Sequence, residues 1–307
     1  MHYLFGQGGS RALPYALLLP GLGLYLLLAL GPSLATVVYS LTDTNGLTPA
    51  PLNFIGLANY REFLFQGAAA AQNLQALLRT LAFCVSVTVV QFALGLVVAV
   101  LLNRQLVGTR LFRALFFLPV ILGITIQGLV WRLFLYPLGG PVDSLLGLFG
   151  GQSELLGGQD AFVWVIVVQI WANMGITMVI FLAGLQTIPD ELHDAARIDG
   201  ASRWQSFVHV TWPLLTPSVN TNLILNVIGS LQAWQLFLVL TGYKPGTQVL
   251  GYVVYAQAFG QTSGSTTSNS FRQGYGAAAS VVLFVLVLVV GLTVMYLARR
   301  REERLLG

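Results

Sequence analysis

The chain has 307 residues, of which 56% are apolar and 8% are charged, and its mean hydropathy is +0.76. Soluble globular domains carry about 25% charged residues, so this composition excludes them and indicates an integral membrane protein. The net charge of +4 requires no nucleic-acid partner, because basic residues in the loops of a membrane protein account for it.

Six apolar stretches are long enough to cross about 30 Å of hydrocarbon as helices, which takes roughly 18 residues or more. We expect membrane spans at Leu13–Leu41, Thr80–Leu102, Ala114–Tyr136, Ala161–Leu185, Trp212–Leu240 and Tyr275–Ala298. The first stretch contains three prolines and is interpreted as one kinked helix, because two spans would need about 40 residues. It is longer than the apolar core of a signal peptide, so we expect it to remain in the mature protein.

The positions of arginine and lysine predict the orientation, because cytoplasmic loops retain positive charge. With the amino terminus inside, the cytoplasmic set is Arg11, Arg104, Arg110, Arg113, Arg197, Arg203, Arg299, Arg300, Arg301 and Arg304. The opposite set is smaller: Arg61, Arg79, Arg132, Lys244 and Arg272. We therefore expect both termini in the cytoplasm, a single membrane domain over residues 1–307, and a cytoplasmic loop at residues 187–211 between the fourth and fifth spans.

The sequence offers no candidate for catalysis or for metal binding. Cys84 is the one cysteine, which excludes a disulfide framework and a cysteine-based metal site. Lys244 is the one lysine and stands in GYKPG, which excludes the phosphate-cradling GxxxxGK[ST] loop and ATP hydrolysis by that route. The three histidines show neither paired ligand spacing nor a nucleophile triad. No charged residue lies in the middle third of any expected span, which argues against a proton relay or a pocket for a charged ligand.

Neutral polar residues do enter the fourth and fifth expected spans. They are Gln169, Trp171, Asn173, Asn220, Asn222, Asn226, Ser230, Gln232, Trp234 and Gln235. Amides in hydrocarbon are satisfied either by another helix or by a ligand and water. Amides and tryptophans without charges suit a neutral polyhydroxylated molecule, whose hydroxyls pair with amides and whose ring stacks on an aromatic plane. Helix packing and ligand binding both remain open for each residue.

Charged residues concentrate in the loop at 187–211. Its first part predicts a short helix with acidic residues in the first turn, where carboxylates favour the positive end of the helix. Gly200 fits the left-handed position just past that helix, and Ser202 with Gln205 matches a capping box that opens a second helix. The loop is either a solvated connector or a docking element for a cytoplasmic partner.

This loop resembles the EAA loop of membrane subunits of ATP-binding-cassette importers, whose pattern is EAA, three residues, G, nine residues, and then I, any residue, L and P. The matching residues here are Asp194, Ala195, Ala196, Gly200, Val210, Trp212 and Pro213. The spacing is kept throughout, with Asp in place of Glu, Val in place of Ile and Trp in place of Leu. The aspartate shortens the acidic arm that would reach a basic residue of the partner.

Other segments are similar to the carbohydrate-importing branch of this family. They are NFIGLANYREF at 53–63, FLAGLQTIPDELHDAARIDGAS at 181–202 and GYGAAASVVLF at 274–284. The resemblance implies an all-α membrane protein with six transmembrane helices of the type I ABC importer permease fold. It also implies a cytoplasmic EAA coupling helix between spans four and five, and a prokaryotic inner-membrane location.

The resemblance further implies partners, and no catalytic residue in this chain. We expect a second permease that is a different chain, two cytoplasmic ATPase subunits and an extracytoplasmic sugar-binding protein. The chain would bind no cofactor, because ATP and Mg belong to the ATPase subunits. The function implied is ATP-driven import of a sugar, an oligosaccharide or disaccharide.

Two sets of site residues follow from the resemblance. Those expected to couple to the ATPase are Asp194, Ala195, Ala196, Arg197, Asp199, Gly200 and Pro213. Those expected along the sugar path are Trp171, Asn173, Ser230, Gln232, Trp234 and Gln235. The alternatives are an importer permease for another solute, such as a polyol, glycerol phosphate or a peptide, and a channel or membrane-embedded enzyme with a regulatory cytoplasmic loop. A phosphate-bearing ligand would want Arg or Lys inside the spans, and an enzyme a charged or metal-binding centre, which this sequence lacks.

Overall fold

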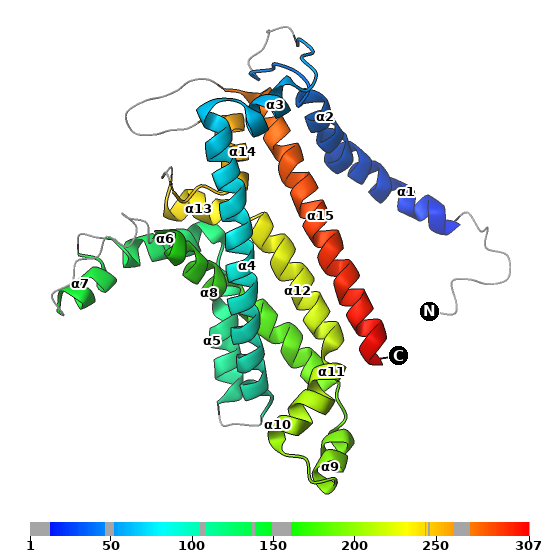
Figure 1. Cartoon of the computed structure of the whole chain (residues 1–307). Coiled ribbons are helices and arrows are strands. Elements are labelled where there is room, and N and C mark those ends of the chain that lie inside the picture. The colour runs from blue at the N-terminus through cyan, green and yellow to red at the C-terminus, as the bar shows by residue number, and fades with distance from the viewer. Residues whose placement is uncertain are drawn as a thin grey trace.

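The computed structural model describes residues 13–46, 52–104, 108–136, 139–148, 161–242, 244, 246–260 and 271–306. Within these ranges the regular structure is helical, apart from an isolated bridge between Thr42 and Phe54. Long helices run side by side, with the short helices α9 and α10 at one end and α3 at the other (Figure 1). Arg11, one of the arginines from which the orientation is predicted, lies outside the described residues. The all-α class is confirmed.

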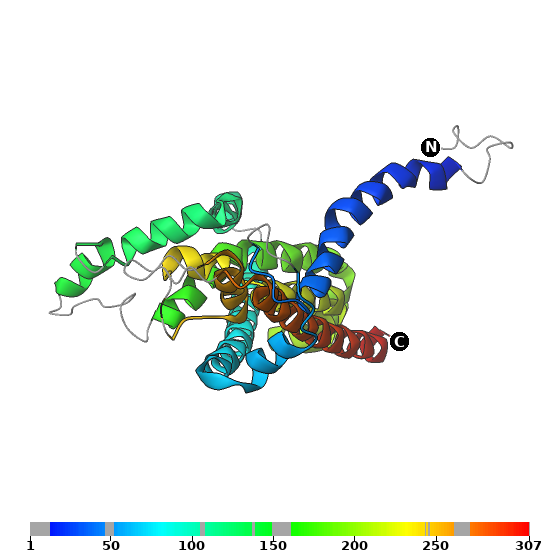
Figure 2. The same cartoon turned by 90° about the horizontal axis from the view of Figure 1, so that it is seen from above.

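The amino-terminal segment forms one long apolar helix that stands away from the other helices (Figures 1 and 2). It consists of α1 (Leu13–Tyr25), a π-helical turn η1 (Leu26–Leu30) and α2 (Gly31–Tyr39). The π turn ends two residues before Pro32, whose ring has no N–H and crowds the preceding turn, so the helix widens there. No residue of the most hydrophobic stretch of this arm is buried, although α2 contacts α15 near its end.

Two helices follow the isolated bridge: α3 (Ala58–Phe65) and α4 (Gly67–Asn103). The second begins well before Thr80, where the sequence predicts the second span to start. Its extra turns follow from the run of alanines after Gly67, because alanine has the highest helix propensity. These turns carry α4 past the apolar stretch to meet α3.

The third expected span, Ala114–Tyr136, is wrong as a single straight helix. It forms α5 (Thr109–Ile121) and α6 (Ile124–Phe134), which are bent by 102°. Leu122 and Gly123 between them are extended, with ψ values of 133° and 144°. Pro119 weakens the last turn of α5, since it cannot donate a backbone hydrogen bond. After the bend the chain continues into α7 (Pro141–Gly147).

The fourth expected span corresponds to α8 (Ala161–Gln186), which lies at the centre of the bundle. Half of its most hydrophobic stretch is buried, more than in any other long helix of the described residues. It packs against α4, α5 and α12. Gly175 lets α5 approach closely, because a Cβ there would collide with the backbone of Phe116 and Phe117.

The fifth expected span, Trp212–Leu240, is also wrong as one helix. It forms α11 (Trp212–Leu214), α12 (Thr216–Leu231) and α13 (Gln235–Leu240). Prolines at 213 and 217 remove donors near the first break, and the second break falls at Gln232–Trp234. A further apolar helix that the sequence analysis did not predict, α14 (Leu250–Phe259), follows. The last helix, α15 (Gln273–Leu306), runs past the expected end at Ala298.

Four helices of the described chain are long and apolar enough to cross a membrane, and the bent pair α5–α6 would make five. The 16 residues of α12 are fewer than the 18 or so that a span needs. The count of six spans therefore stays a prediction.

Candidate functional site

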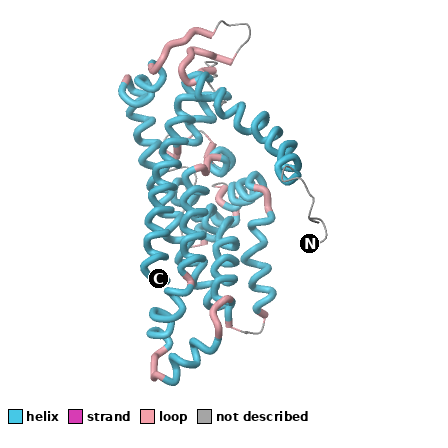
Figure 3. Tube along the Cα trace, turned by 90° about the vertical axis from the view of Figure 1, so that its right-hand side faces the viewer, coloured by secondary structure: helices cyan, strands magenta, loops and turns pink. Residues whose placement is uncertain are grey.

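The loop at 187–211, here called the α9–α10 loop, projects from one end of the bundle (Figures 1 and 3). It contains α9 (Asp190–Ile198), α10 (Arg203–Ser206) and the π-helical turn η2 (Phe207–Thr211). Asp190 and Glu191 occupy the first turn of α9 and Arg197 the last, which suits the charge distribution of the helix dipole. The short helix predicted from the sequence is confirmed.

Gly200 ends α9 in the left-handed conformation, with a φ of +78°. Its N–H donates to the carbonyl of Arg197 at 3.0 Å, and the N–H of Ala201 donates to the carbonyl of Ala196 at 2.9 Å. These two bonds form a Schellman motif, which satisfies carbonyls at the end of the helix. No atom lies within 4 Å of a Cβ built at Gly200, so backbone conformation rather than space favours glycine here.

The second helix begins with the expected capping box. The hydroxyl of Ser202 accepts from the N–H of Gln205 at 3.3 Å, and the side chain of Gln205 accepts from the N–H of Ser202 at 2.7 Å. His193 and Ser206, joined by a side-chain contact of 3.2 Å, tie the two helices together. The loop therefore holds its own shape through bonds between near neighbours.

The residues expected to contact an ATPase lie together on the α9–α10 loop and are largely open to solvent. Asp194 pairs with Arg197 at 3.1 Å, with the two side chains 65% and 78% exposed. Such a pair contributes at most about 0.5 kcal/mol to stability. Ile198, at 86% exposed, and Trp204, at 72%, add uncovered apolar area beside these charges. Pro213 lies apart from them, half-buried in α11.

The α9–α10 loop joins the bundle through an aromatic and charged junction. Trp204, Phe207 and Trp212 form a chain of ring contacts, with centroids 5.8 Å and 6.3 Å apart. The guanidinium of Arg301 on α15 lies 5.0 Å from the ring of Trp212. Nearby, the amide of Asn220 donates to Glu302 at 2.8 Å. These contacts attach the end of α15 to the segment that leaves the loop.

A pocket of about 300 Å³ lies deeper in the bundle, between α5, α6, α8 and the break that follows α12. We call it the amide pocket, because its polar wall is made of neutral side chains: Gln127, Gln169, Asn173, Gln232, Trp234 and Gln235. No charged side chain lines it. The break between α12 and α13 contributes Gln232 and Trp234, since the chain leaves the helical path at Gln232–Trp234, and Gln235 is the first residue of α13.

Four of the six residues predicted for a sugar path line this pocket, and two lie elsewhere. Trp171 contacts Trp131 edge to face, with ring centroids 5.6 Å apart. Ser230 is buried and donates to the carbonyl of Asn226 at 2.6 Å within its helix. Trp234 stacks on Tyr255 of α14, with centroids 4.7 Å apart and planes at 22°.

Gln127 is a pocket residue that the sequence analysis missed. Its amide donates to the carbonyl of Leu122 at 3.0 Å and to that of Pro119 at 2.7 Å, which also accepts from the backbone N–H of Leu122 at 3.1 Å. In an apolar setting such carbonyls need a donor, so the glutamine stabilises the bend and shapes one wall. A lone glutamine shortly after a Pro and a Gly in an apolar run is the signal that could have identified it.

A buried hydrogen-bond network lies beside the amide pocket and joins three helices. The amide of Gln91 on α4 donates to Thr177 on α8 and to Asn226 on α12, both at 2.9 Å. Asn222 donates to the carbonyl of Thr177 at 3.3 Å. Helix packing therefore accounts for these amides, one of the two alternatives that the sequence left open.

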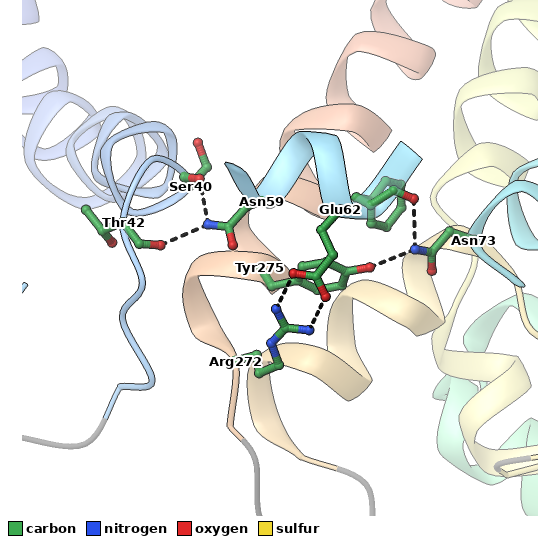
Figure 4. Close-up of polar contacts among 8 residues, drawn as sticks. Ser40, Thr42, Asn59, Glu62, Asn73, Arg272 and Tyr275 are labelled. Atoms are coloured by element: carbon green, nitrogen blue, oxygen red, sulfur yellow. Dashed lines mark hydrogen bonds and ion pairs between the residues drawn. The ribbon is translucent and has the colours of Figure 1, made fainter. Parts of the chain in front are cut away.

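A second polar group, the α3–α15 cluster, lies at the end of the bundle opposite the α9–α10 loop (Figure 4). Glu62 accepts two bonds from Arg272, at 2.8 Å and 2.7 Å. The Arg272 guanidinium also lies 4.3 Å from the ring of Tyr275. Asn73 donates to the hydroxyl of Tyr275 at 2.8 Å and to the carbonyl of Phe63 at 3.1 Å. The cluster joins α3, α4 and the start of α15.

The ion pair of this cluster favours the charged form of both partners. The hydrogen bonds from Arg272 lower the pKa of Glu62 below its usual value of 4.5, against the smaller opposing effect of burial. The same bonds raise the pKa of Arg272. Neighbouring Asn59 donates to the carbonyls of Ser40 and Thr42, each at 2.9 Å, and so fixes α3 to the end of the amino-terminal arm. Among the described residues, no group of three or more His, Cys, Asp and Glu could hold a metal ion.

Comparisons with known proteins identify relatives of this chain. Residues 91–303 match the family model described as binding-protein-dependent transport system inner membrane component. The multiple sugar-binding transport system permease MsmF of Streptococcus mutans is 32% identical over 275 residues, covering 88% of this chain and 90% of that protein. The arabinooligosaccharides transport system permease AraP of Halalkalibacterium halodurans is 29% identical over 297 residues, covering 94% of this chain and 88% of that protein.

The fold has a counterpart among solved structures. A chain of the bacterial alginate ABC transporter, solved in complex with an alginate pentasaccharide-bound periplasmic protein, superposes with a TM-score of 0.79. The two chains are 23% identical, and the match covers 94% of this chain and 95% of the other. The architecture is thus that of an ABC importer permease.

Proposed function

Because the chain belongs to the family of binding-protein-dependent transport system inner membrane components, we propose that it forms the sugar pathway of an ATP-driven importer. The observation that carries the sugar assignment is the amide pocket, whose polar wall holds five neutral amides, one indole and no charge. Amides donate to and accept from hydroxyls, and an indole face suits the apolar face of a sugar ring. The names of MsmF and AraP, both sugar transport permeases, support the same class.

We propose an oligosaccharide or disaccharide as the solute. Gln232 and Gln235 are exposed at the break after α12, so their amides are accessible from the pocket. Trp234 lies between them and is held by Tyr255, which leaves the indole as a fixed platform. A phosphate-bearing solute is not favoured, because a phosphate in such a pocket would need Arg or Lys, and the lining has neither.

In this proposal the energy comes from other chains. Two cytoplasmic ATPase subunits bind ATP and Mg, and this chain binds no cofactor and has no catalytic residue. The α9–α10 loop docks in the ATPase through Asp194, Ala195, Ala196, Arg197, Asp199 and Gly200, and Pro213 begins the segment that carries the movement into α12. Docking shifts the bundle between two conformations only if the contacts between loop and ATPase differ in free energy between them. A loop that keeps its own shape can pass such a difference on to the bundle.

The remaining partners follow from the same assignment. A second permease, a different chain, completes the pathway, and an extracytoplasmic binding protein delivers the sugar. Both termini of the chain lie in the cytoplasm, in keeping with the excess of arginine at that end. The alginate transporter was solved in complex with a periplasmic protein that carries an alginate pentasaccharide, which supports the binding protein as a partner.

The test is sugar-stimulated ATPase activity of the assembled importer, screened over monosaccharides and oligosaccharides. We expect the double variant Gln232→Leu, Gln235→Leu to need at least about tenfold more sugar for half-maximal transport. The reason is that each lost hydrogen bond to a buried hydroxyl costs about 1 kcal/mol. Gln66→Leu is the matched control, because Gln66 is exposed between α3 and α4. Unchanged transport in the pocket variant would refute the sugar pathway.

A further inference from the structure

A second pocket, larger and unlike the amide pocket in composition, lies at the end of the bundle near the α9–α10 loop. It measures about 1000 Å³ and is formed by the last turn of α4, the first turns of α5 and the end of α8. Its charged lining consists of Arg104, Arg110, Arg113 and Asp190. We call it the arginine pocket. None of the residues proposed to dock the ATPase or to contact sugar lines it.

The arginine pocket carries excess positive charge. Three guanidinium groups face one carboxylate, and the two ion pairs of the described residues, Arg197–Asp194 and Arg272–Glu62, lie elsewhere. Arg104 and Arg110 are exposed, so their donors are accessible. Guanidinium groups match the geometry of phosphate oxygens, to which they donate paired hydrogen bonds.

Arg113 is held at the wall of this pocket by the backbone. Its Nη2 donates to the carbonyl of Leu102 at 3.2 Å, which offsets the negative end of α4. Its Nε is buried and has no acceptor in the described part of the chain. The guanidinium is therefore fixed in position at the wall, where its charge adds to the positive potential of the pocket.

The start of α5 adds to the positive potential. The helix has 13 residues, its N-cap is Gly108 with a φ of +87°, and neither a side-chain cap nor an acidic residue covers its first turn. Such an end carries roughly half a positive charge and favours anions. The carboxyl end of α8 lies in the same wall and opposes this with roughly half a negative charge. The three arginines outweigh that opposition and Asp190 together.

An apolar strip leads away from the pocket along α5. Leu111, Leu115 and Leu118 are spaced by four and three residues, so they share one face of the helix. They are 62%, 54% and 56% exposed, and Leu111 also lines the pocket. A soluble phosphate has no apolar surface to bury against such a strip, whereas an acyl chain packs along it. The combination of anion pocket and apolar strip points to a lipid.

We propose that the arginine pocket binds the phosphate of an anionic phospholipid in the cytoplasmic leaflet, with an acyl chain along Leu111, Leu115 and Leu118. The inference goes beyond the proposed function and takes from it only the orientation that puts these helix ends at the cytoplasmic surface. Basic pockets at the cytoplasmic surface suit anionic headgroups, and each arginine near that surface adds to the attraction. The lipid would brace α4, α5 and α8 beside the α9–α10 loop.

The experiment uses the assembled importer in nanodiscs that contain phosphatidylglycerol or only phosphatidylcholine, with retained lipid counted by native mass spectrometry. We expect the wild type to retain phosphatidylglycerol, and the double variant Arg104→Gln, Arg110→Gln to retain it about thirtyfold less, which corresponds to about fivefold for each arginine. Neither residue makes an ion pair within the described chain, so the variant should fold. Arg299→Gln with Arg304→Gln removes the same charge from the end of α15 and should retain the lipid.

Four results would overturn the proposal. The first is equal retention of phosphatidylglycerol by the wild type and the Arg104, Arg110 variant, and the second is an equal loss in the Arg299, Arg304 control. The third is binding of inorganic phosphate without lipid, which would make the pocket a site for a soluble anion. The fourth is release of the ATPase subunits with lipid retained, which would make the pocket a protein contact. Because lipid retention is counted without sugar, a failed sugar assignment would leave this result unaffected.

Discussion

The α9–α10 loop and the α3–α15 cluster lie at opposite ends of the bundle and are held together over very different distances in the sequence. The capping box joins residues three positions apart, and the Schellman bonds span three and five. In the cluster, Glu62 and Arg272 are 210 positions apart, and Asn73 and Tyr275 are 202 apart. The loop is built from its own residues, whereas the cluster exists only while three separate helices stay in place.

This difference assigns distinct roles to the two ends. A loop that is closed by local hydrogen bonds keeps its shape when the helices of the bundle move. A partner can therefore bind the same loop structure in both states of the bundle. A cluster of long-range bonds must break or slide when the same helices separate. We therefore expect the α9–α10 loop to move as a rigid unit. We expect the α3–α15 cluster to resist separation of the helices at its own end of the bundle, and to break when they separate.

The largest expected effect comes from breaking the closure of the loop. Gly200→Asp places a side chain at a φ of +78°, where a left-handed conformation costs about 1 to 2 kcal/mol, and adds a charge to the docking surface. We expect uptake to fall at least about tenfold and the ATPase subunits to dissociate, while the chain still inserts into the membrane. Uptake in vesicles and copurification of the ATPase measure this.

The control for that variant is Gly242→Asp. Gly242 has a φ of +60° and open space around it, so it suffers comparable strain outside the α9–α10 loop. If Gly200→Asp still took up solute and held its ATPase, the docking role of the loop would be wrong.

The next effect tests the other end. Arg272→Gln leaves Glu62 without its partner, and we expect a loss of about 1 to 2 kcal/mol in stability, a value reduced for the partial exposure of both side chains. Hydrogen exchange should show faster opening of α3, with the α9–α10 loop unchanged. Arg61→Gln on the same helix is the control, since Arg61 makes no ion pair within the described chain. Equal exchange in both variants would contradict the bracing role.

Acidification should act on the cluster and spare the loop. The pKa of Glu62 is lowered in the folded chain, so its ionised form favours folding above the usual value of about 4.5, and this stability is lost as pH falls through the lowered pKa. The unfolding midpoint of the wild type should therefore fall more steeply below about pH 4.5 than that of Glu62→Gln. Parallel pH profiles for the two proteins would argue against the ion pair.

The smallest expected effect is in the capping box. Ser202→Ala removes one acceptor from a four-residue helix, which should cost about 0.5 to 1 kcal/mol and fray the start of α10. Faster exchange of the Gln205 amide would measure it. Ser202→Thr keeps the hydroxyl and should restore protection, whereas protection that survives Ser202→Ala would mean that the contact between His193 and Ser206 alone holds α10.

The same contrast explains which features could be predicted from the sequence. Gly200 and the pair Ser202 and Gln205 act on backbone groups a few residues away, so their spacing alone predicts the structure around them. Arg272 enters the sequence analysis only as a positive charge, because nothing near it indicates a partner 210 positions away. The polar residues of the fourth and fifth spans were identified, but their separation into pocket wall and helix contact depends on three-dimensional packing.

The breaks in the long helices were missed for a related reason. Apolar length alone predicts one helix through Ala114–Tyr136, and the bend needs both extended residues at Leu122 and Gly123 and a donor from Gln127. Likewise, α12 ends at Leu231 inside a stretch that has no charged residue. In both places the break becomes favourable only because side chains from the folded bundle, or a cavity, surround the freed backbone groups.

Helix α15 connects the two ends that have been compared. It is continuous from Gln273 to Leu306, so its 34 residues form a rod of about 50 Å. One end carries Tyr275 of the α3–α15 cluster, and the other carries Arg301 against Trp212. As a lever of that length, it converts a change in tilt of about 5° at one end into a displacement of about 4 Å at the other. The length of α15, rather than any chain of side-chain contacts, therefore determines how large a displacement at the far end follows from a movement at the Trp212 junction.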